Sequence, residues 1–443
     1  MLRNASILVG GLLLGAASAA VFVHPALLGG TQAKAAVQAS YNPLLLFGEI
    51  FEAVRSDYVD PTDDTKLVEA AVDAMLVSLD PHSNYMAPKS FRDMQVQTRG
   101  EFGGLGIEVT MEEGLVKVNN PNEDGPAFRA GVKPGDFITE VDGTAILGLT
   151  LNQAVEKMRG AVGTPVAIKI KRGGSDAPLE FKIVREIIPI VSVRSRVETD
   201  VGYIKIDQFT EKTFDGLKKE MAKIKAAIPP DRFRGYVVDL RNNPGGLVDQ
   251  AVRVVDSFLD RGEIVSIRGR KGGDVQRYDA QAGDLADGRP VIVLINGASA
   301  SASEIVAGAL QDHHRATVLG TRSFGKGSVQ TIVPLGQNNG GLRLTTARYY
   351  TPAGRSIQAL GIDPDIEVWV DVPPELAALA QSRGEAGLRG HLANANAAAE
   401  RAASSVYVPR DTSKDNQLII AYDLLRGLRT NPAFLPGTGP ANP

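Results

Sequence analysis

The sequence predicts an α/β protein of several domains whose core is a largely parallel sheet. Two strand–loop–helix units carry this prediction. The apolar runs Tyr236–Leu240 and Val291–Ile295 indicate buried strands, and each is followed by a loop of small residues and a helix. Strands that alternate with helices favour a parallel sheet with its site at the carboxyl ends of the strands. The 443 residues are enough for two or three domains.

Composition excludes several classes of function. The chain has 48 basic and 51 acidic residues, so its charge gives no indication of nucleic-acid binding. It has no cysteine, which excludes disulfides, thiolate metal ligands and cysteine nucleophiles. Its five histidines form no His-Glu-x-x-His pattern, and we expect neither a metal site nor a cofactor.

The N-terminus has the features of an export signal. Arg3 precedes the apolar run 7–23, and small residues alternate at Ala17–Ala19 and Ala33–Ala35. We expect cleavage after Ala35, which makes residues 1–35 a signal peptide. An uncleaved anchor is the alternative, although this apolar run is short for a hydrocarbon core that takes about 20 residues to span.

Both flanks of the folded region are predicted to be helical. In residues 36–99 apolar side chains recur every three or four positions, and Asp80-Pro81 interrupts the pattern. Residues 371–443 are expected to form a helical tail, with one Ala-rich helix over Pro373–Ser405 and another over Asn416–Leu428. The first flank is too short for a large core of its own, so we expect it to pack on another domain or a second chain.

Residues 100–186 have a different order of elements. A glycine-rich segment leads into short strands, and the turn A-x-x-A-G-V-x-x-G-D occupies Ala127–Asp136. This order and this turn resemble a PDZ domain. The N–H groups of Leu105, Gly106 and Ile107 can then hold a terminal carboxylate, while the next strand pairs with an extended peptide. The alternative is that the glycines only form a tight turn.

A serine cluster follows the strand Val291–Ile295. Ser299, Ser301 and Ser303 stand at the start of a predicted helix, where unpaired backbone N–H groups can hold a developing oxyanion. Spacing alone does not choose among the three serines.

Two rival sites are weaker. Gly320–Gly327 nearly matches a phosphate-binding loop, but Gly327 offers no hydroxyl for Mg²⁺ and a strand is expected to follow in place of a helix. His313 and His314 could act as a base for a serine, but they end a polar segment and no acid partner can be assigned.

Lys326 is the remaining base. An ordinary lysine is protonated at neutral pH, but burial in an apolar pocket lowers its pKa towards neutrality. If residues 327–330 are extended, Lys326, Ser328 and Gln330 share one face, and Gln330 can hydrogen-bond the amine. A surface cation is the alternative role for this lysine.

Three segments form a specific combination: Asp239–Gly246, Ser299–Ile305 and Ser323–Gln330. They follow an export signal, a helical segment and a PDZ-like domain. In this order they resemble the carboxy-terminal processing protease family. The resemblance implies a crotonase-like, ClpP-like α/β protease core that uses a Ser–Lys dyad without histidine.

The resemblance also implies the roles of individual residues. Ser301 is the expected nucleophile, Lys326 the general base, and Gln330 the residue that orients the lysine. The expected oxyanion donors are backbone N–H groups of these residues: Ala302, and Gly246 or its neighbour Gly245.

Two further roles follow from the same resemblance. The PDZ domain is expected to gate the site, and Arg159, at the end of a helix, to link peptide binding to activation. The alternative for Arg159 is a side chain that faces solvent. Glu304 is expected to support the site.

Together these expectations describe an exported, ATP-independent serine endopeptidase of five regions. The regions are a signal peptide (1–35), a helical segment (36–99), the PDZ domain (100–186), the protease core (187–370) and a helical tail (371–443). Substrates would be unfolded or flexible protein C-termini. The resemblance implies a homo-oligomer in a bacterial periplasm, an adaptor protein as a further partner, and membrane attachment only through an uncleaved N-terminus. The alternatives are a catalytically silent peptide-binding scaffold and an adaptor that uses only its PDZ domain.

Overall fold

The computed structural model describes residues 30–437, except for 113, 176, 272 and 395–399. Most of the expected signal peptide, residues 1–29, therefore lies outside the described residues. The chain divides into two compact units, with the boundary between Val72 and Asp73. Within the described residues, no helix has the length and apolar content needed to cross a membrane.

The first unit is helical, as expected. Helix α2 spans Gly30–Asp57, and α3 spans Asp64–Val77 and crosses the boundary into the second unit. The apolar side chains that recur along α2, such as Leu44 and Ile50, are exposed. The periodic pattern therefore marks a face that no other part of the described unit covers.

The second unit opens with three short elements. Strand β1 spans Asn84–Met86, α4 spans Pro88–Arg99 and β2 spans Glu101–Gly104. Gly100 ends α4 with a left-handed φ of 70°, which favours glycine at this position. Strand β2 pairs antiparallel with β9 (Glu186–Pro189), so the two chain segments that enter and leave the next domain lie side by side.

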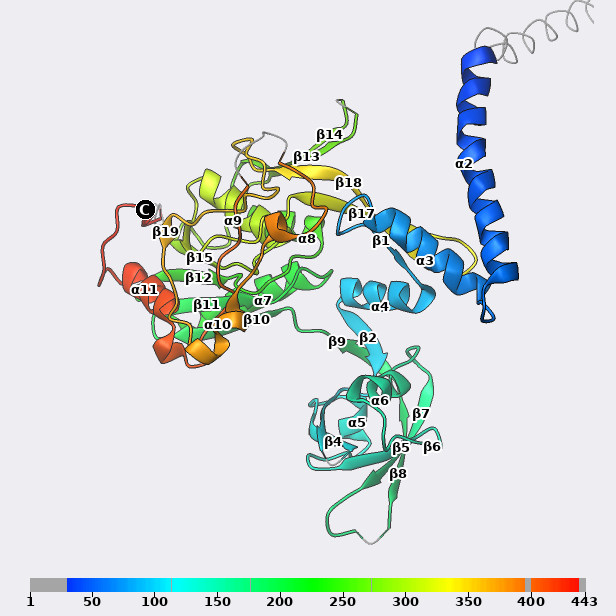
Figure 1. The fold of residues 1–443 in the computed structure, drawn as a ribbon. Helices are drawn as coiled ribbons and strands as arrows, with labels where there is room; N and C mark the ends of the chain where they lie inside the picture. Colours follow the sequence, from blue (N-terminus) through cyan, green and yellow to red (C-terminus); the bar gives the residue numbers. More distant parts are fainter. Residues whose placement is uncertain (1–29, 113, 176, 272, 395–399, 438–443) are drawn as a thin grey trace, which may run out of the picture. The chain divides into compact units, whose positions relative to one another are not determined.

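A small antiparallel sheet with two helices follows between β2 and β9 (Figure 1). Its strand order is β3-β4-β5-β7-β8, and β6 pairs with β5. The strands are β3 (Ile107–Glu112), β4 (Leu115–Pro121), β5 (Phe137–Val141), β6 (Thr144–Ala145), β7 (Pro165–Lys171) and β8 (Leu179–Val184). The helices are α5 (Pro126–Arg129) and α6 (Leu151–Met158). This sheet and its helices enclose a separate apolar core that includes Val116, Ile138 and Ile168.

The main sheet has six strands in the order β10-β11-β12-β15-β16-β19. All neighbours run parallel except β10 and β11. The strands are β10 (Val193–Glu198), β11 (Val201–Ile206), β12 (Gly235–Asp239), β15 (Val291–Ile295), β16 (Thr317–Gly320) and β19 (Ile366–Glu367). Every residue of β12 and β15 is buried, which explains why these strands are continuous apolar runs.

Helices cover both faces of this sheet (Figure 1). Side chains alternate between the faces, so Tyr236 and Val238 pack in one apolar cluster and Val237 packs in another. The first cluster includes residues of α7 (Thr213–Ala227), α8 (Val248–Asp256) and α9 (Ala302–Asp312). The second includes residues of α11 (Asn416–Leu425).

A second sheet, which the sequence did not predict, lies beside the core. It has the order β1-β18-β13-β14, and β17 also pairs with β18. The strands are β13 (Gly262–Gly269), β14 (Val275–Ala280), β17 (Ser328–Pro334) and β18 (Gly341–Tyr350). The polar stretch after Arg268 forms the turn and second strand of the β13–β14 hairpin, and its described side chains are mostly exposed. The strand expected after Lys326 is β17.

The predicted helix over Pro373–Ser405 is wrong. Among the described residues of this stretch, the structure has only η1 (Pro374–Leu376), α10 (Ala377–Ala380) and η2 (Glu385–Gly387). Left-handed glycines at Gly384 and Gly390 interrupt the run. The segment instead lies along the core, where Glu385 N–H donates to Phe324 O at 3.0 Å and Arg401 N–H to Ala359 O at 3.0 Å. The short η3 (Thr412–Lys414) then precedes α11.

Candidate active site

Ser301 lies at the sharp turn between β15 and α9. Its backbone has φ 56° and ψ −113°, a strained conformation for a residue other than glycine, and it is the residue before the first turn of α9. A strained strand-to-helix turn is how α/β-hydrolases present a nucleophile at the top of a sheet. The strain at Ser301 points to a functional position.

The hydroxyls of the two neighbouring serines already serve structural hydrogen bonds. Ser299 Oγ donates to Leu240 O at 2.9 Å and accepts from Asn296 N–H at 2.9 Å. Ser303 Oγ donates to Asn243 O at 3.0 Å. Both side chains tie α9 to the end of β12. Geometry therefore separates Ser301 from its neighbours, which sequence spacing alone could not do.

Ser301 lines a cavity of about 470 Å³ that also contains Lys326 and Gln330. Tyr349, another lining residue, makes a side-chain hydrogen bond with Ser301, and burial raises the pKa of the tyrosine to about 12. Within the described residues, no hydrogen bond joins Ser301 Oγ to Lys326 Nζ. Ser301 and Lys326 thus line one cavity without a hydrogen bond between their side chains.

Lys326 is a partly buried amine with an unusual pKa. Burial lowers its pKa from 10.5 to about 8. The nearby charges act on the same pKa: Glu385 raises it, Arg343 lowers it, and Glu304 and Asp80 raise it. A substantial share of the amine is neutral slightly above pH 7, as a general base requires.

The side chain of Gln330 is in contact with Lys326, as the shared strand face predicted. Lys326 Nζ donates to Gln330 Oε1. The amide nitrogen of Gln330 donates to Ser328 Oγ at 3.0 Å and to Thr345 Oγ1 at 3.2 Å. Gln330 can therefore fix the direction in which the amine points.

Glu304 is completely buried under the site and accepts four hydrogen bonds. One carboxylate oxygen accepts from Ser301 N–H at 2.8 Å and Lys326 N–H at 2.9 Å. The other accepts from Ser323 Oγ at 2.5 Å and Gly325 N–H at 2.6 Å. Burial raises the pKa of Glu304 to about 7, against these hydrogen bonds, which favour the charged form.

Two of the three expected oxyanion donors are free to act. Within the described residues, the N–H groups of Ala302 and Gly246 donate to no other group. The alternative donor is wrong, because Gly245 N–H donates to Asn243 Oδ1 at 2.9 Å. Gly245 contributes space instead: a Cβ on it would lie 2.8 Å from Ser301 Cβ and 3.0 Å from Ala302 N.

A buried ion cluster holds the loop that carries Gly246. Arg241 pairs with Asp239 Oδ2 at 2.8 Å and with Asp415 Oδ2 at 2.8 Å, and all three side chains are almost fully buried. Arg241 and Lys205 hold the pKa of Asp239 well below its usual range, against the effect of burial. The end of β12 is therefore tied to the start of α11.

The rival sites of the sequence do not form. His313 Nε2 contacts Glu263 O at 2.6 Å, and neither it nor His314 lines the cavity. The residues after Gly327 form β17, so no helix start is available for a phosphate.

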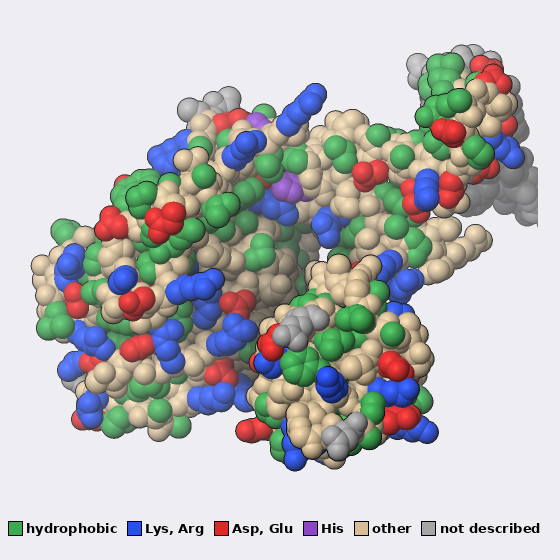
Figure 2. Space-filling view, turned by 60° about the horizontal axis from the view of Figure 1, so that its bottom comes forward, with side chains coloured by type: hydrophobic (Ala, Val, Ile, Leu, Met, Phe, Trp, Pro, Cys, Tyr) green, Lys and Arg blue, Asp and Glu red, His purple; other side chains and the backbone are tan. Residues whose placement is uncertain are grey.

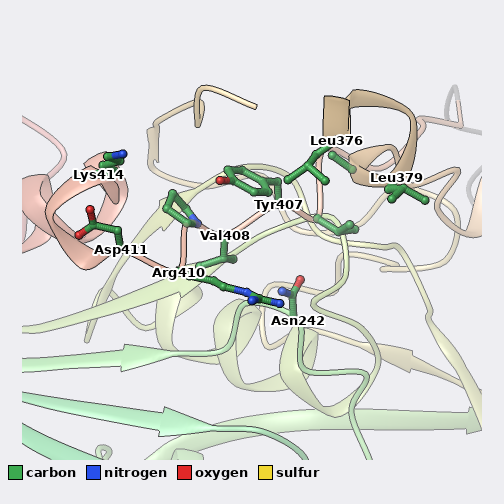
Figure 3. Close-up of a pocket in the computed structure, with 11 residues that line it drawn as sticks. Asn242, Leu376, Leu379, Tyr407, Val408, Arg410, Asp411 and Lys414 are labelled. Atoms are coloured by element: carbon green, nitrogen blue, oxygen red, sulfur yellow. The ribbon is translucent and has the colours of Figure 1, made fainter. Parts of the chain in front are cut away.

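A second cavity of about 680 Å³ lies against Asn242, between Leu376, Leu379, Tyr407 and their neighbours (Figure 3). The described residues that line it include no serine or threonine.

The expected peptide-binding residues lie at the start of β3. Leu105 O accepts from Ala127 N–H at 3.0 Å and Gly106 O from Asn122 N–H at 2.8 Å, and Gly106 has a left-handed φ of 67°. In the described chain, the N–H groups of these two residues have no acceptor. The side chain of Arg159 lies over the Phe102 ring of β2, 4.3 Å from its centroid. It thus contacts the connection between the domains.

Three family models match the chain. Peptidase family S41 matches residues 200–368, the PDZ domain residues 103–183, and the activating protease CtpB N-terminal domain residues 27–90. A carboxy-terminal-processing protease of Bartonella bacilliformis is 57% identical over 399 residues, 90% of this chain and 92% of the relative. A probable CtpA-like serine protease of Staphylococcus haemolyticus is 36% identical, over 72% of this chain and 63% of its own length.

A solved structure, the photosystem II D1 C-terminal processing protease, is 30% identical, covers 75% of this chain and 95% of its own, and has a TM-score of 0.41. The family models and the Bartonella relative make this chain a serine-type peptidase with a PDZ domain. It belongs to the carboxy-terminal-processing protease family.

Proposed function

We propose that this chain is an exported, ATP-independent endopeptidase that selects protein C-termini with its PDZ domain and cleaves with a Ser301–Lys326 dyad. The observation that supports the dyad most strongly is the shared cavity. Ser301, strained at a helix start, lines it together with a partly buried lysine whose pKa is lowered to about 8. A hydroxyl nucleophile beside a neutral amine is the arrangement that acyl transfer by Ser–Lys chemistry requires.

In the acylation step the neutral amine of Lys326 takes the proton of Ser301 Oγ as the oxygen attacks the scissile carbonyl carbon. The carbonyl oxygen becomes an oxyanion, which the N–H groups of Ala302 and Gly246 can stabilise. When the tetrahedral intermediate collapses, the C–N bond breaks and the lysine ammonium donates its proton to the leaving amine. Lys326 then takes a proton from a water molecule, whose oxygen attacks the acyl carbon; the bond to Ser301 Oγ breaks, and the lysine ammonium returns the proton to Oγ.

Before the first proton transfer, Lys326 has to move towards Ser301. Its amine donates to Gln330, and the serine side chain is bonded to Tyr349. Catalytic hydrogen bonds in unliganded enzymes are often long and shorten only when substrate binds. We infer that substrate in the cavity displaces the tyrosine contact and brings the two side chains together.

The PDZ groove supplies the proposed selection of C-termini. The free N–H groups of Leu105 and Gly106 can hold a terminal carboxylate, and the edge of β3 can add a peptide strand. A substrate with an amidated C-terminus removes the carboxylate but leaves the peptide unchanged. We expect the amidated substrate to have a higher KM, and an equal KM would contradict this part of the proposal.

The overall charge of the chain indicates no preference for a substrate of one sign. Acidic and basic side chains are interspersed on the face shown in Figure 2. The whole chain has a formal net charge of −3. This is consistent with a peptidase that recognises a chain end and accepts varied sequences behind it.

The dyad is tested with casein and three proteins: wild type, Ser301→Ala and Lys326→Ala. We expect cleavage by wild type alone. A fluorophosphonate probe should label Ser301 in wild type, and the labelled residue is found by mass spectrometry. Equal cleavage by all three proteins would rule out the dyad. Absence of both cleavage and labelling in wild type would favour a peptide-binding scaffold.

Export is tested separately. The full chain is expressed in a Gram-negative host, and the periplasm is separated from the cytoplasm and the membranes. We expect a periplasmic protein whose first residue is Ala36. A membrane-bound product that keeps residues 1–35 would identify the uncleaved anchor, and a cytoplasmic product would overturn the proposed localisation.

A further inference from the structure

The loop after α3 contains a buried carboxylate that the proposed mechanism does not use. Asp80, only 3% exposed, accepts at Oδ1 from the N–H groups of His82 at 2.9 Å and Ser83 at 3.0 Å. Its other oxygen accepts from Ser83 Oγ at 2.7 Å. The sequence presented Asp80-Pro81 only as a break between helices, whereas the structure shows a rigid, polar turn.

This turn is hydrogen-bonded to Thr345 on strand β18. Thr345, on β18, donates its hydroxyl to Asp80 Oδ1 at 3.0 Å. Its backbone N–H donates to Ser83 Oγ at 3.1 Å. The pairing of β1 with β18 holds the two segments in register. Thr345 thus has a fixed rotamer and a fixed direction for its hydroxyl proton.

The direction of that proton determines the direction of the Gln330 amide. A carboxylate can only accept, so the Thr345 hydroxyl must donate to Asp80 and keeps its lone pairs for another donor. That donor is the amide nitrogen of Gln330, 3.2 Å away. With its nitrogen committed to Thr345, Gln330 has to present its carbonyl oxygen, Oε1, to Lys326.

We propose that Asp80 and Thr345 are positioning residues that orient the amine of Lys326 through Gln330. This inference rests on the proposed Ser–Lys function. A neutral amine has two hydrogens and one lone pair, and a carbonyl oxygen can bind only a hydrogen. The lone pair is then left for the proton of Ser301. If the Gln330 amide were reversed, its NH₂ group would donate to the lone pair of the Lys326 amine, and the amine could not accept the proton of Ser301.

Asp80 also acts on the amine through its charge. The charged groups that affect Lys326 are Glu385, Glu304 and Asp80, which favour the ammonium form, and Arg343, which disfavours it. Loss of the Asp80 charge should therefore lower the pKa of Lys326. Asn in its place can still accept from Thr345, so Asp80→Asn removes the charge and keeps the orientation.

The experiment compares Thr345→Val, Thr345→Ser and Asp80→Asn with Thr346→Val as a matched control. Thr346 is the next residue of β18, and its exposed hydroxyl bonds Thr331 at 2.7 Å, away from the site. Initial rates are measured from pH 6 to 10 with a quenched fluorescent peptide taken from a casein cleavage product. Thermal unfolding of each variant shows whether it is folded.

We expect Thr345→Val to lower kcat by about 10- to 100-fold with a nearly unchanged KM, since only the base is misoriented. Thr345→Ser should restore most of the rate, and Thr346→Val should match wild type. Asp80→Asn should move the acid limb of kcat/KM to lower pH.

Some outcomes would overturn the proposed positioning role of Asp80 and Thr345 and leave the proposed Ser–Lys dyad intact. One is wild-type kinetics for folded Thr345→Val while Ser301→Ala and Lys326→Ala are inactive. Another is an acid limb that Asp80→Asn does not move. If instead Ser301→Ala or Lys326→Ala keeps wild-type activity, the proposed function itself fails.

Discussion

Ser301 and Lys326 donate their backbone N–H groups to the same oxygen of Glu304, at 2.8 and 2.9 Å. One buried carboxylate therefore joins the start of α9 to the loop that precedes β17. Ser301 and Lys326 are 25 positions apart in the sequence, and this shared acceptor fixes the relative positions of their two segments. Positioning of this kind, rather than new chemistry, can account for several kcal/mol of a catalytic barrier, up to about 10.

Glu304→Gln should reduce activity more than it reduces binding. The amide NH₂ must face one pair of donors, either the N–H groups of Ser301 and Lys326 or the Ser323 hydroxyl and Gly325 N–H, and that pair loses its acceptor. We expect kcat to fall by about 100-fold and KM to change little. Steady-state kinetics checks this, with Glu211→Gln, an exposed carboxylate, as the control. A kcat within twofold of wild type would show that the shared acceptor is dispensable.

Lys326→Met should stabilise the protein at neutral pH. Because the folded-state pKa of about 8 lies below the unfolded value of 10.5, the buried charge costs stability below pH 8. This cost, up to about 3 kcal/mol, is relieved as the pH rises through the interval between the two values. Urea unfolding at pH 7 and pH 10.5 should show a gain in free energy of unfolding at pH 7 that largely disappears at pH 10.5. An equal gain at both would contradict the lowered pKa.

The pH dependence of cleavage should follow the charges around Lys326. Wild-type kcat/KM should rise with an apparent pKa of about 8, when the base becomes neutral. Glu385 favours the ammonium, so Glu385→Gln should lower this pKa and move the rise to lower pH. Arg343 disfavours it, and Arg343→Gln should move the rise to higher pH. Shifts of both variants in the same direction would exclude this electrostatic account.

Arg241→Met should destabilise the fold strongly. The substitution leaves the buried Asp415 without an ion-pair partner and leaves Asp239 with Lys205 alone, at 3.3 Å, a loss of about 3–5 kcal/mol. Asp239 has a lowered pKa, so its stabilising contribution is present at neutral pH and is lost as the pH falls. The difference from wild type should therefore narrow on acidification. Arg194→Met removes an exposed pair with Asp207 and should cost under about 1 kcal/mol. Urea unfolding of both variants and wild type at pH 7 and at about pH 3, below the unfolded pKa of Asp239, measures these differences.

Local sequence signals predicted the elements that depend on neighbours in the chain. The runs at β12 and β15 are apolar throughout because both faces are covered, and the glycine-rich start of the small domain leads into a strand, β3, as expected. Apart from β17, the strands of the second sheet were not predicted. Strand β1 joins this sheet through a partner far along the chain, with Asn84 opposite Arg343. Nor could composition reveal that Pro373–Ser405 would lie along the core instead of forming a helix.

Some residues of the candidate site could likewise be predicted from the sequence, and others could not. Ser301, Lys326 and Gln330 could be named from motifs, and the structure places all three at one cavity. The choice of Gly245 as a donor was wrong, although Asn243 two residues earlier is the pattern of a turn in which Asn accepts the N–H at i+2. Asp80 was not found, because it reaches Thr345 across 265 positions.

The pairing of β2 with β9 has a consequence for how such enzymes can be altered. Glu101 lies opposite Pro189 and Gly104 opposite Glu186, so the two ends of the PDZ domain lie side by side on paired strands. A domain whose two ends are adjacent can be replaced by another domain without a change in the path of the rest of the chain. A different PDZ domain inserted between Gly104 and Glu186 could therefore direct the peptidase to a chosen C-terminal tag.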